Sequence, residues 1–415
     1  MLSRMRVDTV KPYIYQFLGL VLPQFVAIGV TSVIVKSAGI QVFGQYSLML
    51  GLLSLAFGVM GSALDTGFQR TCDPVKLNTI LVAKLLVWIV VLPCIIMAAW
   101  LMNLGWFTMM CLAIGFVFQQ SMATLVVKHR ITGLDSKSVA PRLVPVLVFF
   151  AAIYVVGPDK ADTIGFLYAI SWIIYSLPIL GLTLWKTNVD LRSSVYVIKS
   201  AWPIWISLLM TQAYGNVDLF LLSYFHSHDV VGAYKIAYTF GSMSIPIAGV
   251  FSFIFLTKIS AAVKAKNQAL TLIVLRQQFT IVGVLGVGLM LFMLFFFPYL
   301  AKLLYGAVSN ATTSAAVIIA VAMVFNMLTM VYSYTLLAFH RENVIAKLSI
   351  VGVVIYLSIS ILLVPIYADK GAALAMVAAY LALFLMYRHA HLKQMKIAFS
   401  RLDKVCITPP NHPEI

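Results

Sequence analysis

Apolar segments long enough to cross a lipid bilayer follow one another along almost the entire chain. Hydrophobic residues make up 62% of the 415 residues and charged residues only 10%, with a mean hydropathy of +0.99. A soluble domain averages about 25% charged residues, and a single core could not bury this much apolar surface. We therefore expect a polytopic integral membrane protein, in which each charge inside an apolar segment needs its own explanation.

Twelve apolar segments are candidates to cross a bilayer core, which requires roughly 20 residues per helix; the fifth is short, and we expect it to extend into the polar loop before it. They are about 12–35, 44–64, 79–102, 106–126, 143–156, 164–185, 203–225, 231–256, 277–298, 313–339, 347–367 and 370–387. None shows the alternation of a strand, and a chain in lipid forms either helices or a closed barrel. The sequence therefore predicts an all-α membrane protein of about twelve transmembrane helices.

Basic residues are distributed unequally between the two sides of this predicted topology. With the N-terminus inside, the cytoplasmic segments hold 23 of the 29 Lys and Arg residues. This asymmetry follows the positive-inside rule and places both termini in the cytoplasm. The net charge of +16 then reflects topology and contact with anionic membrane lipid, and we expect no nucleic-acid partner.

An internal repeat divides the chain into two halves. The tripeptide Gly44-Gln45-Tyr46 opens the second segment, and Gly232-Ala233-Tyr234 opens the eighth, 188 residues later. We expect each Gly to permit a tight turn and each Tyr to lie at the membrane interface. A spacing of six helices predicts two parallel repeats related by a pseudo-two-fold axis along the membrane normal. The expected domains are residues 1–186 and 187–387, each of six helices, followed by a cytoplasmic amphipathic tail, 388–415.

Two ionisable residues near the seventh and eighth segments are the strongest candidate functional groups. Asp218 follows Asn216 inside an apolar segment, where a carboxylate costs about 2.5–3.5 kcal/mol and normally faces a cavity or a partner. We expect an ion or proton site, or a salt bridge in a cleft; a structural pair that locks helix packing is the alternative. Lys235 is expected to face an anionic substrate or to pair with Asp218, and snorkelling to the exterior interface is the alternative.

Other charges suggest cleft and gate positions. Lys84 and Lys36 are further candidates for a cationic cleft, although Lys84 has the depth for snorkelling and Lys36 is placed as an interface residue. Asp65 and Arg70 lie where the second segment reaches the cytoplasm, and we expect an ion pair that braces the inner mouth or a gate that breaks during transport. Pro23, followed by Gln24, predicts a kink in the first helix beside a polar cavity, with a static packing kink as the alternative.

The sequence gives no support to an enzyme. It contains no H-E-x-x-H, no Walker sequence and no Gly-rich nucleotide loop, so we expect neither a cofactor nor a nucleotide. His226, His228 and Asp229 could mimic a metal site, but a polar exterior turn is the preferred interpretation, and no metal is expected. The exterior loops are too short to hold a polymerase or glycosyltransferase domain.

Five short motifs in both halves resemble the polysaccharide transporter family, which includes Wzx-type O-antigen and capsule flippases. They are N-V-D at 216–218, V-G-A-Y-K-I-A at 231–237, I-F-L-T-K-I-S at 254–260, F-G-Q-Y at 43–46 and D-T-G-F at 65–68. The family belongs to the multidrug/oligosaccharidyl-lipid/polysaccharide flippase superfamily. One departure is Thr257, where a proline is common, so the eighth helix ends less sharply.

The resemblance implies a flippase that moves an undecaprenyl-diphosphate-linked oligosaccharide repeat unit from the cytoplasmic to the periplasmic leaflet of the bacterial inner membrane. It also implies a V-shaped pair of six-helix lobes around a cationic cleft, alternating access, and proton or sodium coupling, for which Asp218 is the deeply buried carboxylate. Polymerase and chain-length proteins of the same pathway are the implied partners. The alternatives are a drug or cation antiporter of the same superfamily, a membrane enzyme of glycan assembly, and a purely structural membrane partner.

Overall fold

The chain folds almost entirely into long helices. The computed structural model describes residues 2–58, 61–65, 77–102, 104–131, 135–185, 191–265, 267–306, 309–339 and 341–405, and none of these residues lies in a β-strand. Eight helices within this part of the chain are long and apolar enough to cross a membrane. The predicted all-α class is therefore confirmed, and the chain is a multi-pass membrane protein.

Five long α-helices lie in the described residues of the N-terminal half. These are α1 (Leu2–Leu53), α3 (Leu77–Leu101), α4 (Trp106–Ile131), α5 (Ala140–Val156) and α6 (Ala161–Trp185). The 52 residues of α1 would extend about 78 Å as a straight helix, more than twice the roughly 30 Å of a bilayer core. The helix bends at Gly39, where φ is 86°, a value that glycine adopts at no steric cost. It therefore supplies the first predicted segment and the first part of the second, which continues to Asp65.

The described residues of the C-terminal half form eight α-helices, several of them paired within one membrane crossing. These are α7 (Leu191–Ala213), α8 (Val217–Phe225), α9 (His228–Ser242), α10 (Ser244–Lys264), α11 (Gln268–Phe295), α12 (Phe297–Tyr305), α13 (Asn310–Ala338) and α14 (Glu342–Val405). Together α7 and α8 form the seventh predicted segment, and α9 and α10 form the eighth. The long α14 bends at Ala368, where φ is 49°, and supplies the last two segments.

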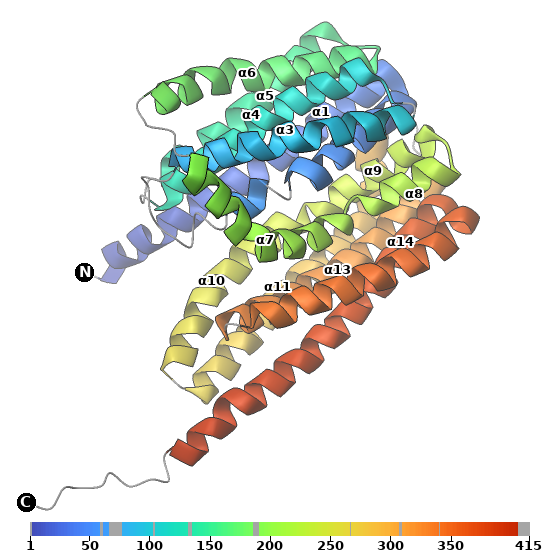
Figure 1. Cartoon of the computed structure of the whole chain (residues 1–415). Helices are drawn as coiled ribbons and strands as arrows, with labels where there is room; N and C mark the ends of the chain where they lie inside the picture. Colours follow the sequence, from blue (N-terminus) through green and yellow to red (C-terminus); the bar gives the residue numbers. More distant parts are fainter. Residues whose placement is uncertain are drawn as a thin grey trace, which may run out of the picture.

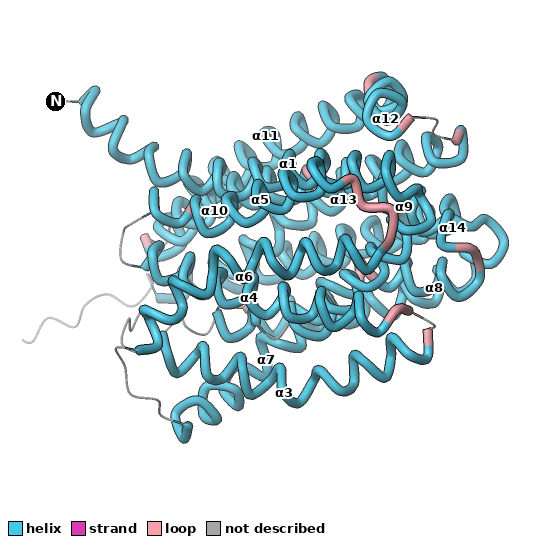
Figure 2. Tube along the Cα trace, turned by 90° about the horizontal axis from the view of Figure 1, so that it is seen from above, coloured by secondary structure: helices cyan, strands magenta, loops and turns pink. Residues whose placement is uncertain are grey.

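The helices form two lobes, which contact each other where α1 meets α9 and, separately, where α7 packs on α3. In the N-terminal lobe α4 packs on α6 and α1 on α5, while in the C-terminal lobe α13 packs on α14 and α11. Figure 1 shows the lobes approaching each other where α9 lies beside α1, and spreading apart where α10 and the last part of α14 slant away. The view from above shows the helices of both lobes running in broadly the same direction (Figure 2). This is the predicted V-shaped arrangement.

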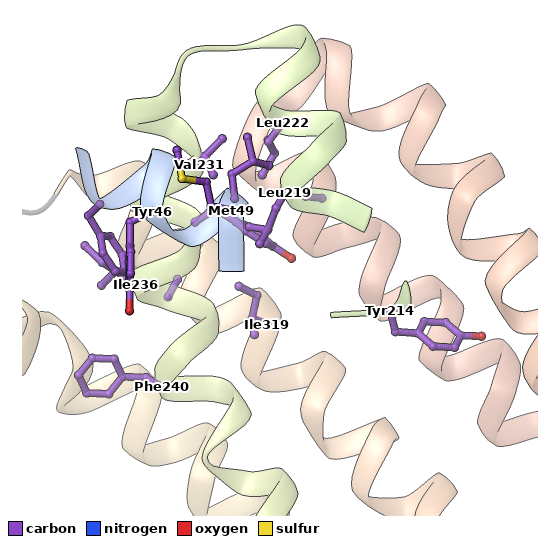
Figure 3. Packing of buried hydrophobic residues seen from close by; sticks show 14 of the residues in the cluster. Tyr46, Met49, Tyr214, Leu219, Leu222, Val231, Ile236, Phe240 and Ile319 are labelled. Atoms are coloured by element: carbon purple, nitrogen blue, oxygen red, sulfur yellow. The ribbon is translucent and has the colours of Figure 1, made fainter. Parts of the chain in front are cut away.

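Buried apolar side chains join the lobes near their meeting point. Met49 on α1, Leu219 on α8 and Val231 on α9 belong to one cluster, and each is at most 1% exposed. Figure 3 shows them on ribbon segments that come from both halves of the chain. Many other large apolar side chains remain exposed on the outer faces of the helices, Trp100 and Val155 among them, as expected for surfaces that contact lipid rather than water.

Candidate functional site

The seventh membrane segment is broken near its middle. Helix α7 ends at Ala213, a turn covers Tyr214, Gly215 and Asn216, and α8 begins at Val217. Asn216 Nδ2 donates a hydrogen bond to the Gln212 carbonyl oxygen at 3.0 Å. Irregular backbone at membrane depth is tolerated where it is buried in protein or lines a water-filled cavity, so this break marks a polar region inside the fold.

Asp218 lies just after the break and is completely buried. It occupies the first turn of α8, where the helix dipole favours a negative charge. The Tyr234 hydroxyl on α9 donates a hydrogen bond to its Oδ2, and the Leu219 amide donates to Oδ1 at 2.9 Å. Asp218 therefore ties α8 to α9. The predicted salt bridge with Lys235 is not formed within 4.0 Å.

Lys235 follows Tyr234 in the chain but faces a different region. Adjacent helical residues point about 100° apart, so Tyr234 reaches Asp218 while Lys235 extends toward the N-terminal lobe. Its Nζ lies 5.0 Å from the centroid of the Tyr238 ring, a cation–π geometry. Among the described residues, no carboxylate oxygen lies within 4.0 Å of this ammonium group.

A cavity of about 330 Å³ separates the two lobes at this level. Its walls come from α1, α4, α5 and α6 on one side and from the α7–α8 turn and α9 on the other; they include Thr31, Tyr46, Gln119, Trp172, Asn216 and Lys235. Of the described residues that line it, Lys235 is the charged one, and none is Asp or Glu. The cavity is thus amphipathic with a single cationic group.

Lys84 is buried within the N-terminal lobe, 1% exposed, and is already paired. Its Nζ lies 2.8 Å from Asp65 Oδ1 and 2.9 Å from Asp65 Oδ2, and it donates to the Gln120 carbonyl at 2.8 Å. Thr124 donates to Asp65 Oδ1 at 2.8 Å. A fully satisfied ammonium of this kind braces helices, so the structure differs from the expectation of a cleft lysine. It also shows that Asp218 is not alone as a buried carboxylate, because Asp65 is 7% exposed.

The two repeat glycines lie inside helices and contact the opposite lobe. A Cβ on Gly44 would collide with the His228 carbonyl and lie 3.0 Å from the Gly232 nitrogen; one on Gly232 would collide with the Ile40 carbonyl and lie 3.3 Å from the Gly44 nitrogen. Neither glycine has a positive φ. The expectation of a tight turn was therefore wrong, and the glycine is needed for close approach of two backbones.

The repeat tyrosines are buried rather than placed at a membrane interface. Tyr46 is 4% exposed and Tyr234 0% exposed, so the expectation of an interface position was also wrong. Tyr46 lines the interlobe cavity, and Tyr234 holds Asp218. The helical period turns each tyrosine inward, two residues after a glycine that faces the other lobe.

The remaining candidates occupy varied positions. Lys36 is exposed and its Nζ donates to the Leu303 carbonyl on α12 at 3.1 Å, which links the ends of the two lobes.

Pro23 and Gln24 lie in continuous helix, and the residue of α1 with non-helical backbone angles is Gly39; the kink at Pro23 stays a prediction. Arg70 falls outside the described residues, as do residues 406–415 of the predicted tail.

Sequence reasoning missed a cluster of buried tyrosines around the break. Tyr214 stacks on Tyr380 with ring centroids 5.4 Å apart and lies 5.6 Å from Tyr356. Tyr234 and Tyr238 stack at 6.4 Å. The available signal was the repetition of tyrosine within apolar segments, where a phenolic hydroxyl needs a partner. No group of metal-ligating side chains occurs among the described residues.

Comparisons with known proteins identify the fold class. Neither a protein-family model nor a curated protein sequence matches the chain. Solved structures do match over nearly its whole length. An inward-facing multidrug resistance MATE family transporter of the MOP superfamily gives a TM-score of 0.67 at 16% identity, covering 92% of this chain and 99% of that chain. The chain thus has the fold of MOP superfamily transporters.

Two further solved structures are also similar to this chain. The lipid II flippase MurJ, in an inward closed conformation, gives a TM-score of 0.71 at 13% identity and covers 96% of this chain and 94% of that chain. A MOP superfamily transporter from Pyrococcus furiosus gives 0.67 at 13% identity, covering 93% and 96%; it is described as having a binding pocket of reverse polarity that suggests a different function. At these identities the likeness shows the fold alone, and each of these proteins is described as a transporter or a flippase rather than an enzyme.

Proposed function

We propose that this protein is a flippase for undecaprenyl-diphosphate-linked oligosaccharide repeat units, moving them from the cytoplasmic to the periplasmic leaflet of a bacterial inner membrane. The observation that carries the proposal is the position of Lys235. It presents an ammonium without a carboxylate partner to a cavity between two lobes. Such a group is costly inside a membrane unless it meets an anion.

A diphosphate supplies the charge that this cavity lacks. Attraction between unit charges 4 Å apart is about 1 kcal/mol in water and about 4 kcal/mol at the effective dielectric of a protein surface. Asn216 and Gln119 on opposite walls add hydrogen-bonding amides. The polyprenyl tail remains in the bilayer, so that the cavity needs to accept the headgroup alone.

Alternating access uses the contact between the lobes. Gly44 and Gly232 close the end of the molecule where α1 and α9 meet, and the distribution of basic residues assigns that end to the periplasmic side. Release of the substrate then requires this contact to open while the lobes close at their cytoplasmic ends. Asp218, buried beside the cavity wall, is our candidate for coupling this rearrangement to a proton or sodium ion.

A drug or cation antiporter is the second candidate, because MATE family transporters share the fold. The lining of the interlobe cavity opposes it, since a cationic drug would meet Lys235 and no acidic residue among the described lining residues. Dye transport by purified protein in liposomes, abolished by cavity substitutions, would favour the antiporter over the flippase.

The test in cells is deletion of the gene in its source bacterium. We expect lipid-linked repeat units to accumulate on the inner leaflet while surface polysaccharide is lost. The wild-type gene restores export, and a gene encoding Lys235→Ala does not, although the protein reaches the membrane at the same level. Normal surface polysaccharide in the deletion strain would refute the proposal.

A further inference from the structure

A second cavity lies inside the C-terminal lobe, on the other side of the break in the seventh segment. It has a volume of about 290 Å³, close to the lower end of the range for small-molecule sites. Its walls come from the end of α7 and the following turn, α9, α10, α13 and α14; they include Gln212, Gly215, Tyr238, Asn326, Ser333 and Tyr380. It is distinct from the interlobe cavity, with which it shares no described lining residue.

The lining of this second cavity is polar but carries no charge among its described residues. It combines amides, hydroxyls and the rings of four tyrosines. An apolar acyl chain would leave these groups without hydrogen-bond partners, which is unfavourable. An ion would find no opposite charge. The chemistry that fits is an uncharged molecule with many hydroxyl groups and a flat face that packs on aromatic rings.

Several hydrogen-bonding groups in the cavity are free to meet such a ligand. The Asn326 amide and the hydroxyls of Tyr238 and Tyr380 make no hydrogen bond to any described residue. These polar atoms also remain accessible, because none of them is among the fully buried side-chain atoms that lack a hydrogen-bond partner. Tyr380 is 6% exposed and lines this cavity.

The two cavities are adjacent through one face of α9. Lys235 lines the interlobe cavity, Tyr238 lines the second cavity, and the Lys235 Nζ lies 5.0 Å from the Tyr238 ring centroid. A group covalently attached to an anion held by Lys235 is therefore within reach of Tyr238. In a lipid-linked oligosaccharide, the group attached to the diphosphate is a sugar.

We propose that the second cavity is a glycan subsite, which takes an uncharged sugar ring of the substrate while the diphosphate lies against Lys235. This inference rests on the proposed function and adds to it the part of the protein that reads the glycan. Asn326 and Tyr380 supply hydrogen bonds to sugar hydroxyls, and Tyr238 supplies an aromatic face. A site built to hydrogen-bond a hydroxyl discriminates strongly against a ligand that lacks it.

The experiment compares two probes that differ by the sugar alone. Purified protein in nanodiscs is titrated with undecaprenyl diphosphate and with undecaprenyl diphosphate carrying one N-acetylhexosamine. The wild type is expected to bind the glycosylated probe about tenfold more tightly, equivalent to about 1.4 kcal/mol. Asn326→Ala and Tyr380→Phe are expected to remove that preference and leave the affinity for undecaprenyl diphosphate unchanged.

Lys235→Ala separates this inference from the proposed function. It is expected to weaken binding of both probes, because it removes the cation that both diphosphates meet. Lys235-dependent binding with no effect of the sugar, or equal losses for both probes in Asn326→Ala, would overturn the subsite while leaving the flippase. Binding of neither probe by wild-type protein would overturn both. Thermal unfolding of each variant, matched to that of wild type, shows that the lobe is intact.

Discussion

Gly44 and Gly232 pack against each other's helix at equivalent positions of the two halves. The Cβ position of Gly44 meets the His228 carbonyl, and that of Gly232 meets the Ile40 carbonyl. Each carbonyl lies four residues before a glycine, so the contact is reciprocal under the 188-residue offset of the repeat. This reciprocity is what a two-fold axis between the lobes produces, and it identifies the glycines as positions of close backbone approach where the lobes meet.

Replacing either glycine with alanine should destabilise the conformation in which α1 and α9 are in contact. Overpacking of a tight contact typically costs about 1–3 kcal/mol, and here the cost applies to the state in which α1 and α9 touch. Gly44→Ala and Gly232→Ala are therefore expected to shift the population toward the conformation with this end open. Labelling of single cysteines placed at Ala233 with a membrane-impermeant thiol reagent measures the shift.

Gly249→Ala is the matched control, because nothing lies within 4 Å of the Cβ position of this helical glycine. It should label at the wild-type rate. If Gly44→Ala and Gly232→Ala also label like wild type while the proteins remain folded, the two glycines do not control the closure between α1 and α9.

The buried pair between Lys84 and Asp65 predicts an asymmetric effect on stability. Lys84→Met leaves the Asp65 charge without its partner and is expected to lower the free energy of unfolding by about 3–5 kcal/mol. The double variant Lys84→Met/Asp65→Leu removes both charges and should regain most of that loss. Thermal unfolding of detergent-solubilised protein, followed by tryptophan fluorescence, provides the measurement.

Lys302→Met serves as the control for this series, since Lys302 is exposed and its loss should change the midpoint little. If the double variant is less stable than Lys84→Met alone, the pair does not act as a mutually dependent unit.

The hydrogen bond from Tyr234 to Asp218 leads to one prediction about stability and one about ion coupling. Tyr234→Phe removes one donor from a buried carboxylate and is expected to cost about 1–3 kcal/mol of stability. Asp218→Asn retains the shape and a hydrogen-bonding oxygen, so it should fold, but it cannot be charged. If Asp218 couples transport to an ion, this variant flips substrate at a rate that no longer responds to an imposed proton or sodium gradient.

Proteoliposomes with and without each gradient distinguish the two roles. An unchanged gradient response in Asp218→Asn would assign Asp218 to helix packing alone, the structural alternative that the sequence also allowed.

The membrane architecture was accessible from the sequence because it depends on local composition. Runs of about 20 apolar residues predict helices whatever their neighbours are, and the two crossings within α1 and within α14 were both recognised as separate segments. The polar run from Tyr214 to Asp218 indicated a candidate functional group within the seventh segment, but the break between α7 and α8 was not predicted.

Partnerships between distant residues were not accessible in the same way. The pairing of Lys84 with Asp65 depends on the register in which α3 packs beside the preceding helix, which composition does not set. The role of Gly44 depends on contact with a helix 188 residues later, and a single helix shows no sign of it. The second cavity depends on which tyrosine hydroxyls remain unpaired after packing, a property of the complete fold.

The most direct test of the account measures translocation itself. Proteoliposomes that contain the purified protein are loaded with fluorescent undecaprenyl-diphosphate-linked oligosaccharide, and the rate at which the probe reaches the opposite leaflet is compared for wild type, Lys235→Ala, Lys235→Arg and the exposed-lysine control Lys370→Ala. We predict that Lys235→Ala slows translocation by about tenfold or more, as loss of a charge-assisted contact worth about 1.5–3 kcal/mol requires, while Lys235→Arg and Lys370→Ala retain most of the rate. Wild-type rates in Lys235→Ala would contradict the account.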